Sequence, residues 1–359
     1  MPRPIGEQVM VVAGASSGVG LATAREAARR GARVVLAARN TLDLAAAAEA
    51  IRRDGGQAVA VPADVADYAQ VEALAARAVE AFGRIDTWVT TAAVSAYAPF
   101  REQPLEDFRR VLEVDFMGQV HCARAALPHL EQTGGALICI GSVLSDRGVP
   151  LQGAYCAAKH ALKGWLDSLR MELRHAGSAV RVTLVKPSAM DTPLFEKAKT
   201  QMGVAPQPIP PVYQPELAVE AILRAAEGNE RDAFVGGAGK LLSVAERVSP
   251  RLVDLLQLRK GFLSQRGDRP RSADAPNNLY APVEYDGGVR GLFGAQARRW
   301  SPYQALEAHA ATAALLGAGA LAVAALAGRG ATGRRLRPLL STGAALLAGK
   351  SLLVRAARG

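Results

Sequence analysis

Short apolar runs alternate with Ala-rich stretches from residue 8 to about residue 185. The runs are apolar throughout rather than at every second position, which is typical of parallel strands that are covered on both faces. The expected strands are residues 9–13, 33–37, 58–62, 87–91, 136–140 and 181–185, with a last strand at 232–235. Helices are expected between them, for example over residues 20–30, 68–82 and 214–228. This alternation predicts an α/β fold with a doubly wound parallel sheet.

A glycine-rich turn lies between the first expected strand and the first expected helix. It reads Gly14-Ala15-Ser16-Ser17-Gly18-Val19-Gly20. Glycines allow a tight turn and let the backbone approach a pyrophosphate, which the free N–H groups at the start of the next helix attract. The location of the turn predicts a dinucleotide site. A plain strand-to-helix turn is the alternative.

Two polar residues follow the next expected strands. Arg39, after the second strand, would complement a 2′-phosphate, whereas an acidic residue there would accept from a ribose hydroxyl. The sequence therefore favours NADP over NAD, and a solvated surface charge is the alternative for Arg39. Asp64, after the third strand, is placed to accept from the adenine amino group or to cap the helix that starts near Tyr68.

Candidate catalytic residues lie between positions 142 and 159. Tyr155 and Lys159 are one helical turn apart and share a face, so the Lys159 ammonium is expected to lower the pKa of the Tyr155 phenol. Ser142 follows the apolar run 136–140 and would present its hydroxyl from a strand end. Because such Tyr and Lys pairs also arise by chance, the assignment depends on the nucleotide site upstream.

Together these motifs resemble those of the short-chain dehydrogenase/reductase family over roughly residues 8–240, which implies a Rossmann fold. The resemblance implies that Ser142 polarises the substrate oxygen, that Tyr155 is the general acid or base, and that Lys159 binds the nicotinamide ribose. It places Thr192, in the loop after Lys186-Pro187-Ser188, at the carboxamide. The expected cofactor-binding residues are Gly14, Ser16, Ser17, Gly18, Gly20, Arg39, Asp64, Val65, Ala92, Tyr155, Lys159, Pro187 and Thr192.

The sequence departs from the family pattern at three places. Ala13 replaces the Thr that usually opens the glycine motif, and Thr90-Thr91-Ala92-Ala93 replaces Asn-Asn-Ala-Gly. Asp115 stands where the family usually has an Asn that supports a water in the proton relay. An ionised Asp115 cannot donate an amide proton, and its charge would oppose ionisation of Tyr155. We therefore expect Asp115 to belong to the catalytic set and to raise the pKa of Tyr155.

Composition narrows the class of protein. The net charge of +10 is largely a property of the end of the chain, where seven Lys and Arg residues follow Gly328 with no acidic residue, so nucleic acid is not an expected partner. The three cysteines lack C-x-x-C spacing, which indicates neither a disulfide framework nor a metal site. No signal peptide is recognisable, and a cytoplasmic location is expected.

The second half of the chain is expected to add a lid and a tail. The Pro-rich segment 194–213 would cover the substrate, whose apolar character is suggested by Val94, Tyr97, Met190 and Phe195. Residues 240–258 are expected to form a helix and 259–300 an aperiodic excursion. The predicted division is a catalytic domain at 1–245, an extension at 246–305 and a C-terminal helical tail at 306–359.

The tail contains two uncharged segments, 310–328 and 339–349. The longer one would reach about 28 Å as a helix, close to a bilayer core, but it is Ala-rich and its basic flank opposes a simple span. For these two segments, helices that lie on the cytoplasmic leaflet and helices that pack on protein remain equal alternatives.

The sequence thus predicts a homo-oligomeric oxidoreductase that uses NADP(H), with NAD less favoured, and acts on an apolar secondary alcohol or carbonyl compound. The alternative function is a non-catalytic NADP-binding regulator or scaffold at a membrane.

Overall fold

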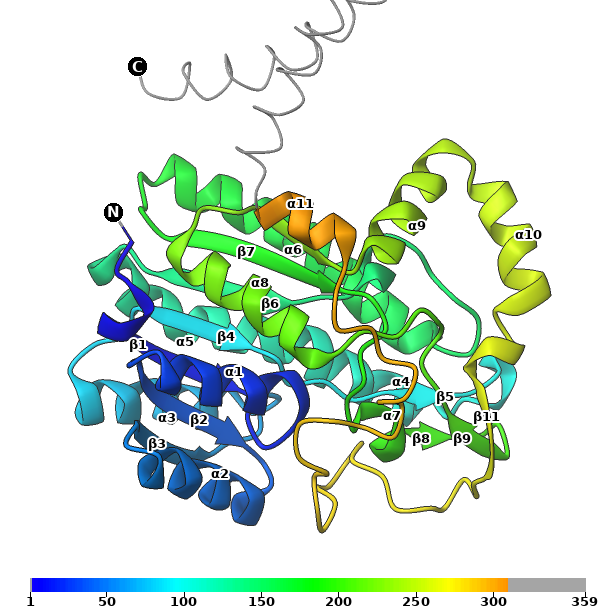
Figure 1. Ribbon diagram of the computed structural model, residues 1–359, viewed down its shortest axis with the longest axis horizontal. Helices are drawn as coiled ribbons and strands as arrows, with labels where there is room; N and C mark the ends of the chain where they lie inside the picture. The colour runs from blue at the N-terminus through cyan, green and yellow to red at the C-terminus, as the bar shows by residue number, and fades with distance from the viewer. Residues whose placement is uncertain (1, 309–359) are drawn as a thin grey trace, which may run out of the picture. The chain divides into compact units, whose positions relative to one another are not determined.

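The protein is organised around a seven-stranded parallel sheet. The computed structural model describes residues 2–308, and Met1–Gln304 form one compact unit. Strands lie in the order β10-β7-β6-β4-β1-β2-β3 (Figure 1). Their bounds are β1 Val9–Ala13, β2 Arg33–Ala38, β3 Gln57–Pro62, β4 Thr87–Thr90, β6 Ala136–Ile140, β7 Arg181–Pro187 and β10 Asp232–Val235. The order reverses between β1 and β4, so a crevice opens at the carboxyl ends of these two strands.

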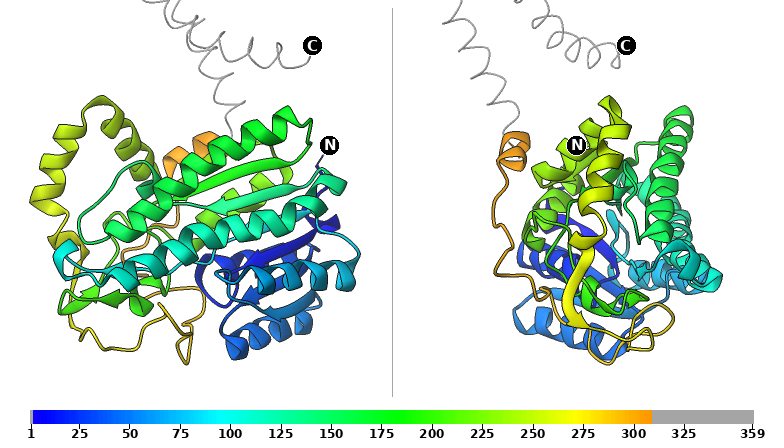
Figure 2. Two further views of the ribbon diagram at one scale, coloured as in Figure 1. Left: turned by 180° about the vertical axis from the view of Figure 1, so that it is seen from behind. Right: turned by 90° about the vertical axis from the view of Figure 1, so that its right-hand side faces the viewer.

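Helices cover both faces of the sheet. One face carries α1 (Gly18–Arg29), α2 (Thr41–Arg53) and α8 (Pro215–Glu227), and the other carries α3 (Tyr68–Phe82), α5 (Gly118–Thr133) and α6 (Gly153–His175). Figure 2 shows the second layer from behind. The shorter α4 (Leu105–Leu112) leads through a single π-helical turn, Glu113–Met117, into α5.

The core has two parts because successive strand residues point to opposite faces. In β1, Met10 and Val12 pack with α1, α2 and α8, whereas Val11 and Ala13 pack with α3, α5 and α6. Both sets of β1 side chains are fully buried. The doubly wound parallel sheet predicted from the continuous apolar runs is therefore confirmed.

Residues 240–258 are helical, as expected, but the helix is divided in two. The structure has α9 (Gly237–Val248) and α10 (Pro250–Lys260), with Ser249 between them. Pro250 lacks the N–H that would continue α9, but at the first position of α10 it leaves no donor missing. We call this pair the α9–α10 hairpin.

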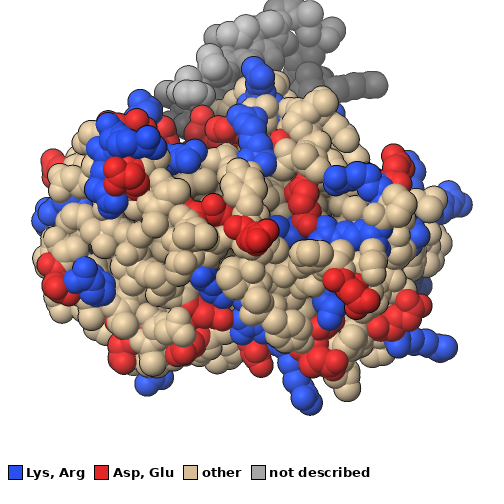
Figure 3. Space-filling view, turned by 90° about the horizontal axis from the view of Figure 1, so that it is seen from below, with Lys and Arg blue, Asp and Glu red and all other residues tan. Residues whose placement is uncertain are grey.

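Smaller elements cluster at the lower right of Figure 1. The segment predicted as a lid contains α7 (Leu194–Lys197), β8 (Lys199–Thr200) and β9 (Val204–Pro206). β8 pairs with β5 (Ala96–Tyr97), and β9 pairs with β11 (Arg266–Pro270) from the extension. Near the end of the described chain, α11 spans Pro302–Ala308. Figure 3 shows this lower face, where Lys and Arg lie beside Asp and Glu.

The uncharged tail segments 310–328 and 339–349 lie outside the described residues. Among residues 2–308, no helix has both the length and the apolar character needed to cross a membrane. The membrane alternatives for the tail and the domain division stay predictions.

Candidate active site

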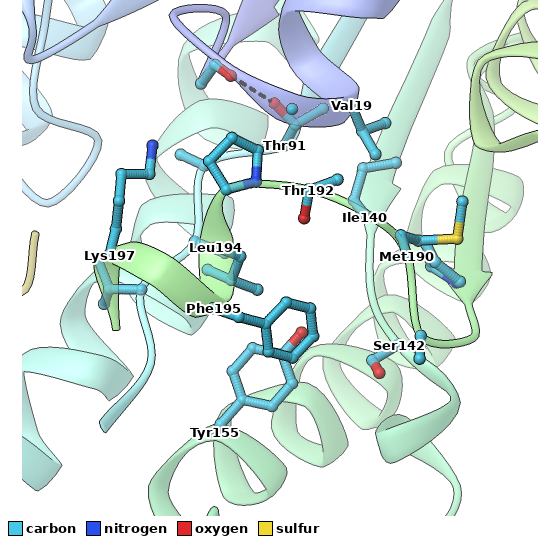
Figure 4. A pocket seen from close by; sticks show the side chains of 18 of the residues that line it. Val19, Thr91, Ile140, Ser142, Tyr155, Met190, Thr192, Leu194, Phe195 and Lys197 are labelled. Atoms are coloured by element: carbon cyan, nitrogen blue, oxygen red, sulfur yellow. Dashed lines mark hydrogen bonds between the residues drawn. The ribbon is translucent and has the colours of Figure 1, made fainter. Parts of the chain in front are cut away.

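One cavity of about 490 Å³ lies at the carboxyl ends of the strands and collects nearly all the residues predicted for the site. Figure 4 shows several of them around it. The predicted residues that line it are Gly14, Ser16, Ser17, Gly18, Gly20, Arg39, Asp64, Val65, Ala92, Ser142, Tyr155, Lys159, Pro187 and Thr192. Asp115 does not line the cavity but lies behind Lys159.

The glycine turn is shaped so that only glycine fits at two of its positions. Gly14 has φ +96°, and a Cβ there would lie 2.4 Å from the Ala92 nitrogen. A Cβ on Gly20 would lie 2.1 Å from the Gly14 carbonyl oxygen. The backbone is therefore drawn into a tight cradle at the amino end of α1, where helix N–H groups favour an anion. These residues fit the pyrophosphate of a dinucleotide.

Ser142 stands directly beyond β6, as the sequence predicted. Its side chain caps a short 3₁₀ turn (Val143–Ser145) and accepts from the Leu144 N–H at 3.1 Å. The same hydroxyl acts to lower the pKa of the Tyr155 phenol. Ser142 and Tyr155 both face the cavity (Figure 4), so one substrate oxygen could be held between their hydroxyls.

Lys159 lies one turn after Tyr155 on α6 and is almost fully buried, with 1% of its surface exposed. Its ammonium donates to the Ile140 carbonyl at 3.1 Å and lies 5.2 Å from the centre of the Tyr155 ring. A buried ammonium requires a countercharge. That countercharge is Asp115, whose Oδ2 is 3.5 Å from the Lys159 Nζ.

Asp115 sits in the π-helical turn between α4 and α5 and is completely buried. Its Oδ1 accepts from the Val94 N–H at 2.8 Å, while Oδ2 has no hydrogen-bond partner within the described residues. Burial raises the pKa of Asp115 to about 6, although the charge of Lys159 and the Val94 N–H act to lower it. Single π-helical turns of this kind are frequent at functional sites.

The pKa of Tyr155 is raised above its ordinary value, first by burial and next by the charge of Asp115, while the hydrogen bond with Ser142 acts in the opposite direction. Lys159 was expected to lower this pKa, but the net shift is upward. The Lys159 ammonium is already engaged by Ile140 and Asp115, and burial of the phenol is the largest cause of the upward shift.

At the end of the cavity where a nucleotide is expected, which we call the nucleotide end, Arg39 is bound by the extension. Its guanidinium donates to the carbonyls of Asn278 at 2.5 Å and Tyr280 at 3.2 Å. Both acceptors belong to residues 276–293, which we call the strap. Asp64 lies close by, paired with Arg110 at 2.7 Å, and the helix that starts at Tyr68 is capped by Asp67 instead. Burial acts to raise the pKa of Asp64, but hydrogen bonds from Ala66 and Arg110 hold it below its usual value.

The strap makes further contacts with the glycine turn. The Gly18 N–H donates to the Gly288 carbonyl at 2.8 Å. Lys197 of α7 donates to Ser17 at 2.7 Å and pairs with Asp286 of the strap at 2.9 Å. Sequence reasoning missed Lys197, Asn278 and Asp286, all of which line the cavity. Lys197 lies in the Pro-rich segment 194–213, and Asn278 and Asp286 lie in the aperiodic extension. Neither segment has a periodicity that would place these residues, and the Asn278 carbonyl, like any main-chain carbonyl, carries no signature in a sequence.

The other end of the cavity is apolar. Val94, Tyr97, Met190 and Phe195 all line it, as expected, and Ile209 and Leu242 join them. The Phe195 ring packs edge-on against Phe293 of the strap, with ring centres 5.7 Å apart. The strap therefore supports both the nucleotide end and the segment over the substrate end.

Comparison with known proteins identifies the family. Residues 8–203 match the family described as short chain dehydrogenase. The oxidoreductase YxnA of Bacillus subtilis, described as uncharacterized, is 40% identical over 281 residues, 77% of this chain and 79% of that protein. The chain belongs to the short-chain dehydrogenase/reductase family.

Other family members have stated activities. Cis-4-hydroxycyclohexanecarboxylate dehydrogenase of Sinomonas cyclohexanicum is 36% identical over 247 residues, which cover 66% of this chain and 96% of that enzyme. An alcohol dehydrogenase from Thermococcus sibiricus, solved with 5-hydroxy-NADP, is 25% identical with a TM-score of 0.56, covering 63% of this chain and 95% of that one. The chain is thus an oxidoreductase of this family, whose members bind a nicotinamide cofactor.

One departure from the family pattern is compensated in the structure. Ala13 provides no hydroxyl to brace the glycine turn, but the Thr91 hydroxyl lies 3.0 Å from the carbonyls of both Ala13 and Gly14. The N–H groups of Thr91 and Ala92 also donate to the Ala13 carbonyl. The glycine turn is therefore braced by Thr91, directly after β4, rather than by a hydroxyl at position 13 of β1.

Proposed function

We propose that this short-chain dehydrogenase/reductase transfers a hydride between NADP(H) and an apolar secondary alcohol or ketone. The observation that carries the proposal is that Ser142, Tyr155 and Lys159 line the same cavity as the glycine turn. A hydroxyl donor and a proton-transfer group therefore share one space with a pyrophosphate cradle.

Each catalytic side chain has a role that follows from its position. The bound nicotinamide supplies or accepts the hydride. In reduction, Tyr155 gives its phenolic proton to the substrate oxygen, and in oxidation it takes the proton back. Ser142 donates a hydrogen bond to the same oxygen. The Lys159 ammonium stabilises the phenolate that reduction leaves, and Asp115 holds that ammonium in place.

Arg39 supports the choice of NADP. It lines the cavity at the end opposite the catalytic side chains and carries a planar cation suited to a phosphate. Two strap carbonyls already orient the guanidinium, which reduces the entropy lost when a phosphate binds. The relative solved with 5-hydroxy-NADP is consistent with this choice.

The substrate class is proposed from the cavity wall. Met190, Phe195 and Ile209 present apolar surface near Tyr155 and Ser142. A ketone with a hydrophobic ring or chain would remove this surface from water, at about 25 cal/mol for each Å² buried. The relative that acts on cis-4-hydroxycyclohexanecarboxylate agrees with a cyclic alcohol.

The test is oxidation of NADPH in the presence of a panel of apolar cyclic and open-chain ketones. Tyr155→Phe is expected to lower kcat by about 10²- to 10⁴-fold, because it removes the proton donor but keeps the ring. The matched control is Tyr68→Phe on α3, outside the cavity.

The competing function, a non-catalytic NADP-binding regulator or scaffold, predicts NADPH binding without turnover of any ketone. Under that function, Tyr155→Phe would leave every measured property of the NADPH complex unchanged. Turnover that survives in Tyr155→Phe at the wild-type rate would contradict our assignment of the proton donor.

A further inference from the structure

The α9–α10 hairpin leaves an unusually apolar surface exposed. Large hydrophobic side chains on its two helices and just beyond them are between 45% and 79% exposed. They are Leu241, Val244, Val248, Leu252, Leu255, Leu256, Leu258, Phe262 and Leu263. In α10 only Val253 is buried. Figures 1 and 2 show the hairpin projecting beyond the edge of the sheet. A contiguous patch of this kind marks an interaction surface.

Helical spacing separates the outer face of α10 from its inner face. Leu252, Leu255 and Leu256 are at i, i+3 and i+4 and therefore share one face. Val253 and Gln257 share a different face, where Val253 is buried and Gln257 lines the cavity. The exposed leucines thus point away from the body of the protein.

The acidic and basic groups of the hairpin differ in whether they are paired. Its two carboxylates, Glu246 and Asp254, both pair with Arg147 of the body at 2.8 and 2.5 Å. The exposed cations Arg247, Arg251, Arg259 and Lys260 form no ion pair within the described residues. The unpaired charges of the outer surface are therefore all basic, while the 57% exposed Asp254 is neutralised by Arg147.

We propose that the outer face of the α9–α10 hairpin docks on an anionic lipid surface. Apolar side chains on a helix pair can enter the boundary between headgroups and acyl chains while cations meet lipid phosphates. A second copy of this chain fits less well, because a twofold contact brings each patch against itself and so sets these cations against one another.

Docking would also bring the cavity near the lipid. Leu242 of α9 and Gln257 of α10 belong to the cavity wall. An apolar substrate could then enter from the acyl region without crossing water. This consequence rests on the proposed function, whereas the docking itself does not.

The experiment uses the full chain carrying a probe on the hairpin. All three cysteines are buried, so an added surface cysteine can be labelled selectively. An environment-sensitive dye is attached to Leu255→Cys. Its fluorescence emission is expected to shift to the blue when vesicles of equal parts phosphatidylglycerol and phosphatidylcholine are added, and to shift much less with vesicles of phosphatidylcholine alone. Leu42→Cys, at a 77% exposed leucine of α2, is the matched control and should not shift.

Vesicle co-sedimentation supplies the second measurement. Leu252→Glu combined with Leu255→Glu is expected to weaken partitioning into the anionic vesicles at least about tenfold, because charges replace the inserted side chains. Arg251→Gln with Arg259→Gln should weaken it severalfold, and Arg53→Gln should not. Activity on a water-soluble ketone should be unchanged in the glutamate variant, which separates loss of docking from loss of the proposed reaction.

Three results would overturn the proposal. The first is a wild-type chain that does not bind the anionic vesicles. The second is binding that is unchanged by the glutamate pair, with no dye shift at position 255, which would assign lipid contact to another part of the chain. The third is a dye at position 255 that is shielded from water before vesicles are added, in an oligomer that the two glutamate substitutions dissociate. That result would assign the patch to a contact between copies of this chain.

Discussion

The catalytic end and the nucleotide end of the cavity are closed by different kinds of contact. At the catalytic end, side chains define the site, since the buried charges of Lys159 and Asp115 balance each other behind Tyr155. At the nucleotide end, main-chain carbonyls of the strap accept from Arg39 and from the Gly18 N–H. The first end depends on which residues are present. The second depends on the path of the chain.

This difference predicts how each end responds to substitution. A changed side chain at the catalytic end removes a reacting group or leaves a buried charge unpaired. Most exposed side chains of the strap can change without loss, because its carbonyls remain. The strap should fail where it is buried. Asn278, Leu279 and Asp286 are its buried residues, and Leu279 alone of these packs in the same apolar core as α3, α5 and α6.

The largest effect is therefore expected from Leu279→Ala. Deletion of a buried leucine side chain should lower the free energy of unfolding by about 2–5 kcal/mol, measured by denaturant titration. The matched control is Leu255→Ala on the α9–α10 hairpin, where the leucine is 56% exposed and the change should stay within about 0.5 kcal/mol in solution. Equal losses in the two variants would show that the strap is no more part of the core than the hairpin.

The next effect tests what Arg39 does at the nucleotide end. If it binds the 2′-phosphate, Arg39→Gln should lower the ratio of kcat/KM for NADPH to that for NADH by about 10- to 100-fold, since hydrogen bonds between charged groups contribute about 1.5–3 kcal/mol. Arg110→Gln is the control, because Arg110 also donates to a strap carbonyl, that of Leu279, at 3.1 Å. An equal loss for both cofactors in Arg39→Gln would make Arg39 an anchor of the strap alone.

The two ends also differ in what the sequence could predict. The sheet, the glycine turn and the catalytic side chains were expected from apolar runs and local spacing, and the structure gathers these residues in one cavity. A strand buried on both faces must be apolar throughout, and Tyr155 and Lys159 must share a helix face, so both leave a local pattern.

The strap left no such pattern. Its contacts with Arg39, Asn40 and Gly18 use carbonyls that every residue possesses, across more than 200 positions of sequence. The sign of the Tyr155 pKa shift was also missed in part. The expected effect of Asp115 agrees with the structure, but spacing alone could not show that burial dominates the pKa of Tyr155.

A smaller effect is expected at the catalytic end from Asp115→Asn. The Asp115 carboxyl, with its pKa near 6, is ionised in the basic range, and its charge raises the pKa of Tyr155. Removal of the charge should therefore move the basic limb of the kcat/KM profile to lower pH, by up to about one unit, or 1.4 kcal/mol. Asp107→Asn, at a buried carboxylate paired with Lys199 at 2.8 Å, is the control and should leave that limb in place. A basic limb that stays fixed in Asp115→Asn would remove Asp115 from the electrostatics of Tyr155.

The smallest effect is expected from a hydroxyl of the strap. Tyr280 donates to Asp107 at 2.9 Å, and its side chain is 51% exposed, so Tyr280→Phe should cost less than about 1 kcal/mol of unfolding free energy. Tyr285→Phe, at a 70% exposed tyrosine of the strap, should cost nothing measurable.

The pH dependence of the Tyr280→Phe difference checks its cause. Burial, with the hydrogen bond to Asp107 and the charge of that carboxylate, raises the pKa of Tyr280 from 10.0 to about 12. A raised pKa in the folded state means that the stabilisation is complete below pH 10 and disappears as the pH rises through about 12. A loss that is the same size at pH 8 and pH 12 would instead come from packing of the ring edge, and the strap would then be held by shape alone.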